Sequence, residues 1–109
     1  MSWDIWLYYD IDGTEARIAE CTEWNYTLNV YPMMKESGFP GFGNTMNGKS
    51  CREIYPKLLS AINIMKNDPN RFIKLNPDNG WGDYESFLVQ LDILVAWMIK
   101  YPSAKVGVG

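Results

Sequence analysis

The stretch WDIWLYYDIDGTEARIAEC, residues 3 to 21, decides the fold class because its side chains alternate in the way that strands require. From Trp3 to Tyr9 every second residue is apolar and points to one face, a period of two that is typical of a half-buried strand. Asp12-Gly13 is a favoured two-residue turn, so Thr14 to Cys21 is predicted to return as a second strand. The protein is therefore expected to begin with a β-hairpin.

Trp6 and Tyr8 fall on the outer face of the predicted first strand. We expect this face to be partly covered, either by a later segment of the chain or by a second subunit, because exposed apolar patches are uncommon. The hairpin is also acidic, since residues 1 to 23 hold six carboxylates against Arg17, a net charge of −5. One alternative is therefore a protein-interaction or structural module that uses this hairpin and forms a homo-oligomer.

Shorter segments complete the predicted sheet. Polar and apolar residues alternate in Trp24 to Pro32, which predicts a third extended piece, and Ala104 to Val108 is a candidate for a short closing strand. Arg71 to Leu75 is also expected to be extended. Met33 to Glu36 is predicted as a helical turn, and Gly38 to Gly48 as a loop rich in glycine and asparagine.

Two amphipathic helices are predicted. The first begins at Ser50, where the pattern S-x-x-E predicts a capping box with Glu53, and it ends at Asn67-Asp68-Pro69. The second has Asp83 as its N-cap and runs to about Lys100. Each carries an apolar stripe at helical spacing. The order of elements predicts an α+β fold in which a small, mainly antiparallel sheet carries both helices on one face.

Composition excludes several kinds of metal and catalytic site. There is no histidine, and the only cysteines, Cys21 and Cys51, are isolated, so zinc sites of the usual Cys/His kind and His-based nucleophilic triads are excluded. We expect both thiols to stay reduced, and we expect neither a metal nor another cofactor. No general acid–base constellation emerges among the carboxylates, so the protein is predicted not to be an enzyme. Residues 1 to 109 have the usual size of one domain.

Net charge and hydropathy limit the kinds of partner that we expect. The net charge of −3 argues against a dedicated nucleic-acid binder, because phosphate contacts usually need a basic surplus. The longest apolar run, Ile93 to Ile99, is much shorter than the roughly 20 residues of a membrane helix, so no membrane partner is expected. The sequence shows no secretory leader, and the expected location is the cytoplasm.

Residues 43 to 50, GNTMNGKS, match the phosphate-loop pattern G-x-x-x-x-G-K-[ST]. A phosphate loop needs a buried strand before it and further parallel strands, whereas residues 36 to 40 do not have the pattern of a buried strand. A P-loop-like nucleotide hydrolase is therefore kept only as an alternative. Lys49 and Arg52, at the predicted helix start in a basic segment, are candidates for contacts with an anion, the alternative being that Lys49 is simply solvated.

A second group of candidates combines amides with aromatic rings: Asn25, Tyr26, Asn29, Asn79, Trp81 and Tyr84. An indole and a phenol can sandwich a planar ring, and asparagine amides can read the edge of a base. The structural alternative is that Trp81 is buried to anchor its turn and that Tyr84 packs into the core. With Lys49 and Arg52 facing its phosphates, this group is the predicted site for a small anionic nucleotide-like ligand.

Two segments, N-Y-T-x-N-V-x-P-M at Asn25 to Met33 and N-P-D-N-G-W-G-D-Y-E at Asn76 to Glu85, resemble a group of small uncharacterised proteins from tailed bacteriophages and actinobacterial genomes. The resemblance implies a phage-type accessory protein and transfers no catalytic residue. We therefore expect a non-enzymatic protein that sequesters a nucleotide-like ligand or inhibits a host defence factor. In a phage setting its location would be the host cytoplasm, and a host protein would be its possible partner.

Overall fold

The computed structural model describes residues 2 to 39 and 41 to 109, and its strands form one layer of the fold. The first strand, β1, pairs antiparallel with each of the other three, so it is the centre of this four-stranded sheet. Tyr8 has register partners in β2 and β4, and Ile5 has them in β3 and β4. A strand has two edges, so β4 lies on one edge of β1 while β2 and β3 share the other. The strands are β1 (Ser2–Ile11), β2 (Thr14–Arg17), β3 (Trp24–Thr27) and β4 (Lys105–Val108).

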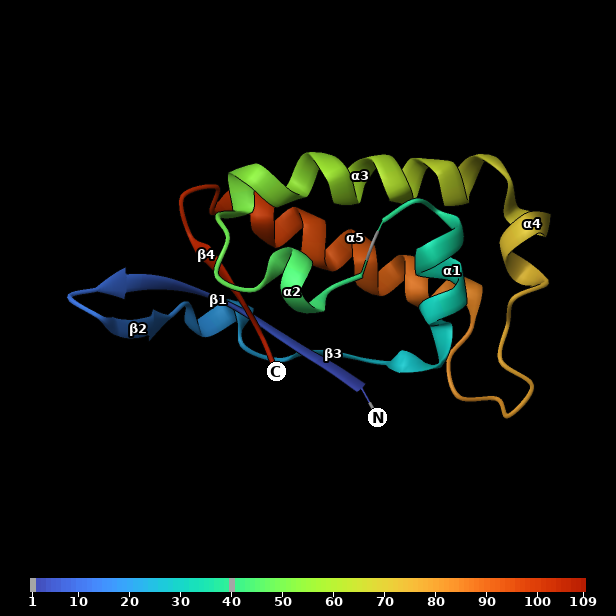
Figure 1. The fold of residues 1–109 in the computed structure, drawn as a ribbon, viewed down its shortest axis with the longest axis horizontal. Coiled ribbons are helices and arrows are strands. Elements are labelled where there is room, and N and C mark those ends of the chain that lie inside the picture. Colours follow the sequence, from blue (N-terminus) through green and yellow to red (C-terminus); the bar gives the residue numbers. More distant parts are fainter. Residues whose placement is uncertain (1, 40) are drawn as a thin grey trace.

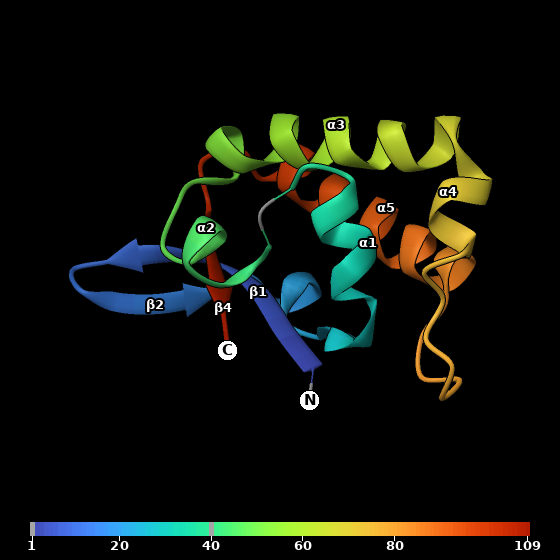
Figure 2. The same cartoon turned by 45° about the vertical axis from the view of Figure 1, so that its right-hand side comes forward.

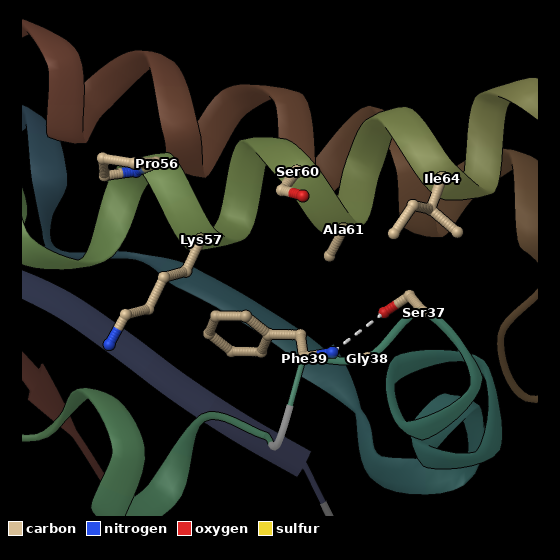
Figure 3. Close-up of a pocket in the computed structure, with 8 residues that line it drawn as sticks. All are labelled: Ser37, Gly38, Phe39, Pro56, Lys57, Ser60, Ala61 and Ile64. Carbon is tan, nitrogen blue, oxygen red and sulfur yellow. Dashed lines mark hydrogen bonds between the residues drawn. The ribbon is translucent and has the colours of Figure 1, made fainter.

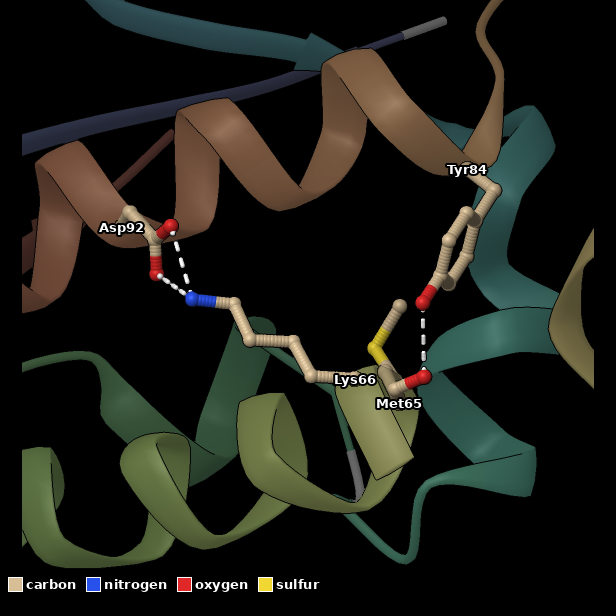
Figure 4. Close-up of polar contacts among 4 residues, drawn as sticks. All are labelled: Met65, Lys66, Tyr84 and Asp92. Carbon is tan, nitrogen blue, oxygen red and sulfur yellow. Dashed lines mark hydrogen bonds and ion pairs between the residues drawn. The ribbon is translucent and has the colours of Figure 1, made fainter. Parts of the chain in front are cut away.

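Two long helices, α3 (Cys51–Asn67) and α5 (Tyr84–Lys100), form the second layer, and Figure 1 shows them side by side above the sheet. Two polar links join them (Figure 4). Lys66 on α3 donates to both carboxylate oxygens of Asp92 on α5, at 3.1 and 3.0 Å, and the Tyr84 hydroxyl donates to the carbonyl of Met65 at 2.7 Å. The predicted α+β fold, a small antiparallel sheet with two long helices, is confirmed.

The alternation of side chains along β1 determines which of them enter the core. Trp3, Ile5 and Leu7 are each at most 6% exposed, and they face the apolar stripes of the two helices. Trp3 meets the ring of Phe42 edge-on, with centroids 4.6 Å apart. Tyr9 continues the same alternation but is 38% exposed, because the β1–β2 hairpin extends beyond the body of the molecule (Figures 1 and 2).

The outer face of β1 is covered by the chain itself at Trp6. Its indole lies against Gly107 of β4, where an added Cβ would overlap the ring, and Nε1 donates to the carboxylate of Glu15 at 2.9 Å. The guanidinium carbon of Arg17 lies 4.2 Å above the ring centroid. Of the two predicted ways to cover this face, the structure therefore shows the one that uses a later chain segment.

Short helices replace parts of the predicted strands. The returning hairpin strand ends at Arg17, and η1 (Ala19–Cys21) follows it. The third extended piece ends at Thr27, whose hydroxyl accepts from the amide of Asn29 at 3.3 Å and starts a turn. The next elements are η2 (Leu28–Val30) and α1 (Tyr31–Glu36), which contains the predicted helical turn.

Two more short helices differ from the prediction. The predicted loop contains α2 (Gly43–Met46), and Pro40 of that loop lies outside the described residues. The prediction that Arg71 to Leu75 is extended is wrong, because α4 (Pro69–Ile73) occupies most of it. Pro69 both ends the preceding helix and occupies the first turn of α4, a position that proline favours since it lacks an amide hydrogen.

Candidate functional site

A groove opens between β3 and the loop of residues 76 to 82. Its volume is about 500 Å³, and it is lined by Ser2, Asn25, Thr27, Asn29, Asn79 and Trp81. The structure therefore brings together four of the predicted site residues, namely Asn25, Asn29, Asn79 and Trp81. None of the lining side chains is charged, and all of them carry a group that can form hydrogen bonds.

Gly82 allows the loop to approach the β3 segment so closely. Its φ is +90°, in the region that glycine favours, and an added Cβ would lie 2.6 Å from Cγ2 of Thr27. Asn79 then closes the turn, since its side-chain oxygen accepts from the amide of Trp81 at 2.9 Å. The Trp81 side chain is 69% exposed, so the alternative in which it anchors the turn by burial is wrong.

The two predicted tyrosines have structural roles. The Tyr26 hydroxyl accepts from the amide of Asp83 at 3.1 Å and lies 2.5 Å from the hydroxyl of Ser86, while its ring packs on Phe87 with centroids 5.1 Å apart. Tyr84 is 6% exposed, and burial raises the pKa of its phenol. Both hydroxyls bond within the protein, so neither tyrosine forms the predicted sandwich with Trp81.

An acidic residue, Asp4, contacts the lining of the groove. The Asn25 amide nitrogen donates to a carboxylate oxygen of Asp4 at 2.7 Å and to the hydroxyl of Ser2 at 3.0 Å, which fixes the orientation of that amide. Asp78 adjoins Asn79 in the loop. A carboxylate in contact with the groove lining repels a phosphate, so the groove suits an uncharged group better than an anionic one.

Lys49 and Arg52 lie away from this groove. They flank the start of α3, which Figures 1 and 2 place at the opposite end of the molecule from the loop of residues 76 to 82. The amides of Cys51 and Arg52 donate to the carbonyls of Ala104, at 2.8 Å, and Pro102, at 2.9 Å. The C-terminal segment therefore occupies donors that an anion at this helix start would need.

The predicted capping box is wrong. Ser50 is the N-cap of α3, as predicted, but its side chain forms no capping hydrogen bond with the helix. The backbone carbonyl of Ser50 instead accepts from the amides of Glu53, at 3.1 Å, and Ile54, at 3.3 Å. Since carbonyls of the C-terminal segment already bond the first amides, the hydroxyl has no capping role to fill.

The stretch that matches the phosphate-loop pattern is not folded as such a loop. Its first residues form α2, and the amide of Asn47 donates to the carbonyl of Gly43 at 3.0 Å. The amide of Gly48 donates to Val106 of β4 at 2.7 Å, and Val106 donates back to Lys49 at 2.9 Å. These amides hold the C-terminal strand, whereas a phosphate loop directs them towards its ligand.

A second hollow lies between α3 and the turn of residues 37 to 39, with a volume of about 480 Å³ (Figure 3). Its walls are mainly apolar, including Phe39, Ala61 and Ile64, and Lys57 extends beside the Phe39 ring. The Ser37 hydroxyl donates to the carbonyl of Met34 at 2.6 Å, so it is engaged within the protein. No predicted site residue lines this hollow.

The cysteines are free, as predicted, and both are buried. Burial raises the pKa of Cys21 to about 11 and that of Cys51 to about 12, so both are neutral thiols at neutral pH. Thiolates are the nucleophilic form of cysteine, and these side chains are therefore unreactive in the folded protein. Across residues 2 to 39 and 41 to 109, no group of three or more His, Cys, Asp and Glu side chains could hold a metal ion.

Sequence reasoning missed Ser2 and Thr27 as groove residues. Ser2 pairs with Thr27 in the register of β1 and β3, and Asp4 pairs with Asn25. Serine and threonine in strands give no signal of their own, and that register is a long-range pairing.

In the described part of the chain no helix is long and apolar enough to span a membrane. No protein-family model, curated protein or solved structure matches the chain.

Proposed function

We propose that this protein acts by binding rather than catalysis, and that its groove holds the uncharged ring of a nucleotide-like ligand. The observation that carries the proposal is the exposure of Trp81, at 69%, on the rim of a groove whose other lining side chains are amides and hydroxyls. Stacking of a base on an aromatic side chain contributes about 1 to 3 kcal/mol, and each neutral hydrogen bond about 0.5 to 1.5 kcal/mol.

The side chains beside Trp81 can read a base. Asparagine carries donor and acceptor groups in one plane, which match the edge of a nucleobase, and Asn25, Asn29 and Asn79 all line the groove. The Asn25 nitrogen already donates to Asp4 and Ser2, so Asn25 offers its oxygen, and the Asn79 oxygen accepts from Trp81, so Asn79 offers chiefly its nitrogen. Asn25 is held in place by Asp4 before any ligand arrives, so ordering this side chain adds little to the entropic cost of binding. Stacking with two or three such bonds sums to about 2 to 7.5 kcal/mol, and the middle of that range, about 4 to 7 kcal/mol, corresponds to a dissociation constant of roughly 10 µM to 1 mM.

The groove favours a nucleoside over a nucleotide. Asp4 and Asp78 lie beside it, and the basic start of α3 lies at the other end of the molecule. A ligand would therefore place its base, with or without ribose, against Trp81 and leave any phosphate in solvent. As a phage-type accessory protein without catalysis it would act stoichiometrically, by sequestering such a ligand or by blocking a host defence factor.

The test is a titration of the ¹⁵N-labelled protein with nucleosides, their 5′-monophosphates and cyclic dinucleotides, followed through the five tryptophan indole signals. We expect the indole signal of Trp81 to shift and that of Trp24, which is 2% exposed, to stay in place. Trp81→Ala should abolish binding of every ligand in the panel. Lys49→Ala is the matched control, because the groove proposal predicts no change in affinity.

Two results would refute the groove as the site. One is the absence of any shift with all compounds at about 10 mM, a concentration well above the expected dissociation constant. The other is binding that requires phosphate, weakens in Lys49→Ala and persists in Trp81→Ala, which would move the site to the start of α3.

A second candidate function is recognition of a protein by the β1–β2 hairpin, because Tyr9 and Ile11 are 38% and 59% exposed on this extended acidic element. Trp6 is held by Glu15 and Arg17 and is less accessible to a partner than these two residues. A partner that binds Trp81→Ala but not Ile11→Asp would favour this function. Loss of binding in Trp81→Ala alone would exclude the hairpin as the contact.

A further inference from the structure

Helix α5 carries an exposed apolar stripe on the side that faces away from the sheet. Val89, Ile93 and Ile99 are 57%, 39% and 51% exposed, and Ala96 between them is exposed as well. The single charged residue from Ser86 to Ile99 is Asp92, which is half-buried and bonded to Lys66. A surface helix normally presents charged and polar residues to water, so this face is unusual for a chain in solution.

Helix α3 widens the stripe. The two helices run in opposite directions, and Lys66 pairs with Asp92 (Figures 1 and 4). Leu59 precedes Lys66 by seven residues and Ile99 follows Asp92 by seven, so these two apolar side chains stand at the same level along the helix pair. Leu59 is 37% exposed. With a rise of 1.5 Å per residue, the stripe from Ser86 to Ile99 is roughly 20 Å long.

We propose that a second copy of this chain docks on the α5 stripe, with the two α5 helices antiparallel across a two-fold axis between residues 92 and 93. This register places Val89 opposite Ala96 of the second copy, so a large side chain meets a small one at both symmetric positions. Ser86 then faces Ile99, and Glu85 faces Lys100. A two-fold interface must be self-complementary in this way.

The charges at the ends of the stripe select this occupant. Glu85 stands at the N-terminal end of the helix and Lys100 at its C-terminal end, so an antiparallel copy sets opposite charges together at both ends. A parallel copy would set like charges together. Lys100 is 3.0 Å from Glu20 of its own chain, yet its side chain is 61% exposed and its ammonium has three donors. The net charge of −3 makes an anionic membrane surface a poor partner.

The interface is small, so the dimer is weak and reversible. A stripe of roughly 20 Å by 10 Å on each copy falls below the roughly 800 Å² per partner that standard stable interfaces bury. We expect a monomer–dimer equilibrium with a dissociation constant of roughly 10 to 500 µM. The groove at Trp81 is formed within one chain, so the dimer and ligand binding can be tested separately.

The experiment is sedimentation equilibrium of the full chain and its variants from about 10 µM to 1 mM, a range that brackets the expected dissociation constant. Ile93→Glu should raise the dissociation constant at least tenfold. Ile64→Glu is the matched control, since Ile64 is also 39% exposed on a long helix but lines the hollow beside residues 37 to 39. This variant should leave the dissociation constant unchanged. Circular dichroism verifies that both variants are folded.

A charge exchange tests the antiparallel register without touching the apolar residues. Glu85→Lys and Lys100→Glu should each weaken the dimer about threefold to tenfold, and the double variant should recover the affinity of the parent, because it restores opposite charges across the axis. The proposal is overturned by a protein that stays monomeric at about 1 mM, by equal effects of Ile93→Glu and Ile64→Glu, or by a double variant weaker than both single ones.

Discussion

Replacing Gly107 by alanine should destabilise the protein through its contact with Trp6. Gly107 is buried in β4, and its register partner is Trp6 on the outer face of the sheet. An added Cβ would lie 2.6 Å from Cζ2 of the indole and closer still to the five-membered ring. Since the Gly107 backbone is bound into the sheet, the indole is the group that must move.

The cost follows from what holds the indole. Displacing Trp6 breaks its hydrogen bond to Glu15, worth about 0.5 to 1.5 kcal/mol, and its contact with Arg17, worth about 0.5 to 1 kcal/mol at an exposed site. The ring also loses dispersion contacts with Gly107 and Gly109. Removing a glycine from a strand offsets roughly 0.5 to 1 kcal/mol of this loss. We expect Gly107→Ala to lower the free energy of unfolding by about 1 to 2 kcal/mol.

Urea denaturation followed by circular dichroism measures this change. Gly43→Ala is the matched control, because Gly43 lies in α2 with no heavy atom within 4 Å of an added Cβ, and there alanine should be neutral or stabilising by up to about 1 kcal/mol. Repeating Gly107→Ala in a Trp6→Ala background should abolish the loss, since the overlapping ring is gone. A loss of the same size in that background would show that Trp6 is not its cause.

Three further predictions concern the helices and the thiols. Asp83→Ala should lower the free energy of unfolding, measured by urea denaturation, by about 0.5 to 2 kcal/mol, because the Asp83 carboxylate accepts from the amide of Ser86 at 2.8 Å and caps α5. Ser50→Ala, which removes no capping bond, should change stability by less than about 0.5 kcal/mol, and equal losses would contradict the assignment of the two caps. Tyr84→Phe should cost about 1 to 2 kcal/mol by leaving the Met65 carbonyl without its 2.7 Å donor, and an unchanged urea midpoint would show that water replaces it. The pKa of Cys21 rises on folding from 9.0 to about 11, and that of Cys51 rises from 9.0 to about 12. The stability that these neutral thiols contribute below pH 9 should therefore fall as the pH rises towards 12. A thiol reagent should react with them only after unfolding.

Local patterns predicted the elements whose signal lies within a few neighbouring residues. The alternation from Trp3 to Tyr9 and the apolar stripes of the two long helices needed no knowledge of the rest of the chain. The prediction for the segment after Pro69 was wrong because its local signal is ambiguous. Proline is compatible both with the end of one helix and with the first turn of the next. The competition between these two outcomes is decided by packing, and Phe72 of α4 is fully buried.

The cap of α3 shows the same limit at the level of single bonds. The pattern S-x-x-E at Ser50 indicates a capping box, yet the amides of Cys51 and Arg52 bond to carbonyls near the C-terminus of the chain. No local pattern could reveal this, since the donors and acceptors are about 50 residues apart in the sequence, and a local cap competes with any distant carbonyl that the fold brings near. The same contact uses up amides on which an anion site beside Lys49 would depend.

The candidate groove was predictable in its residue types and not in its electrostatics. Amide and aromatic side chains cluster in two segments of the sequence, and four of them meet between β3 and the loop of residues 76 to 82. Whether Lys49 and Arg52 would join them depended on the direction of α3, which the sequence pattern does not encode. Because that helix starts at the far end, Lys49 and Arg52 are separated in space from the groove proposed to hold a ring. A nucleoside that binds at least as tightly as its monophosphate is therefore the result that follows from this fold, whereas a requirement for phosphate would show that the groove is not the site.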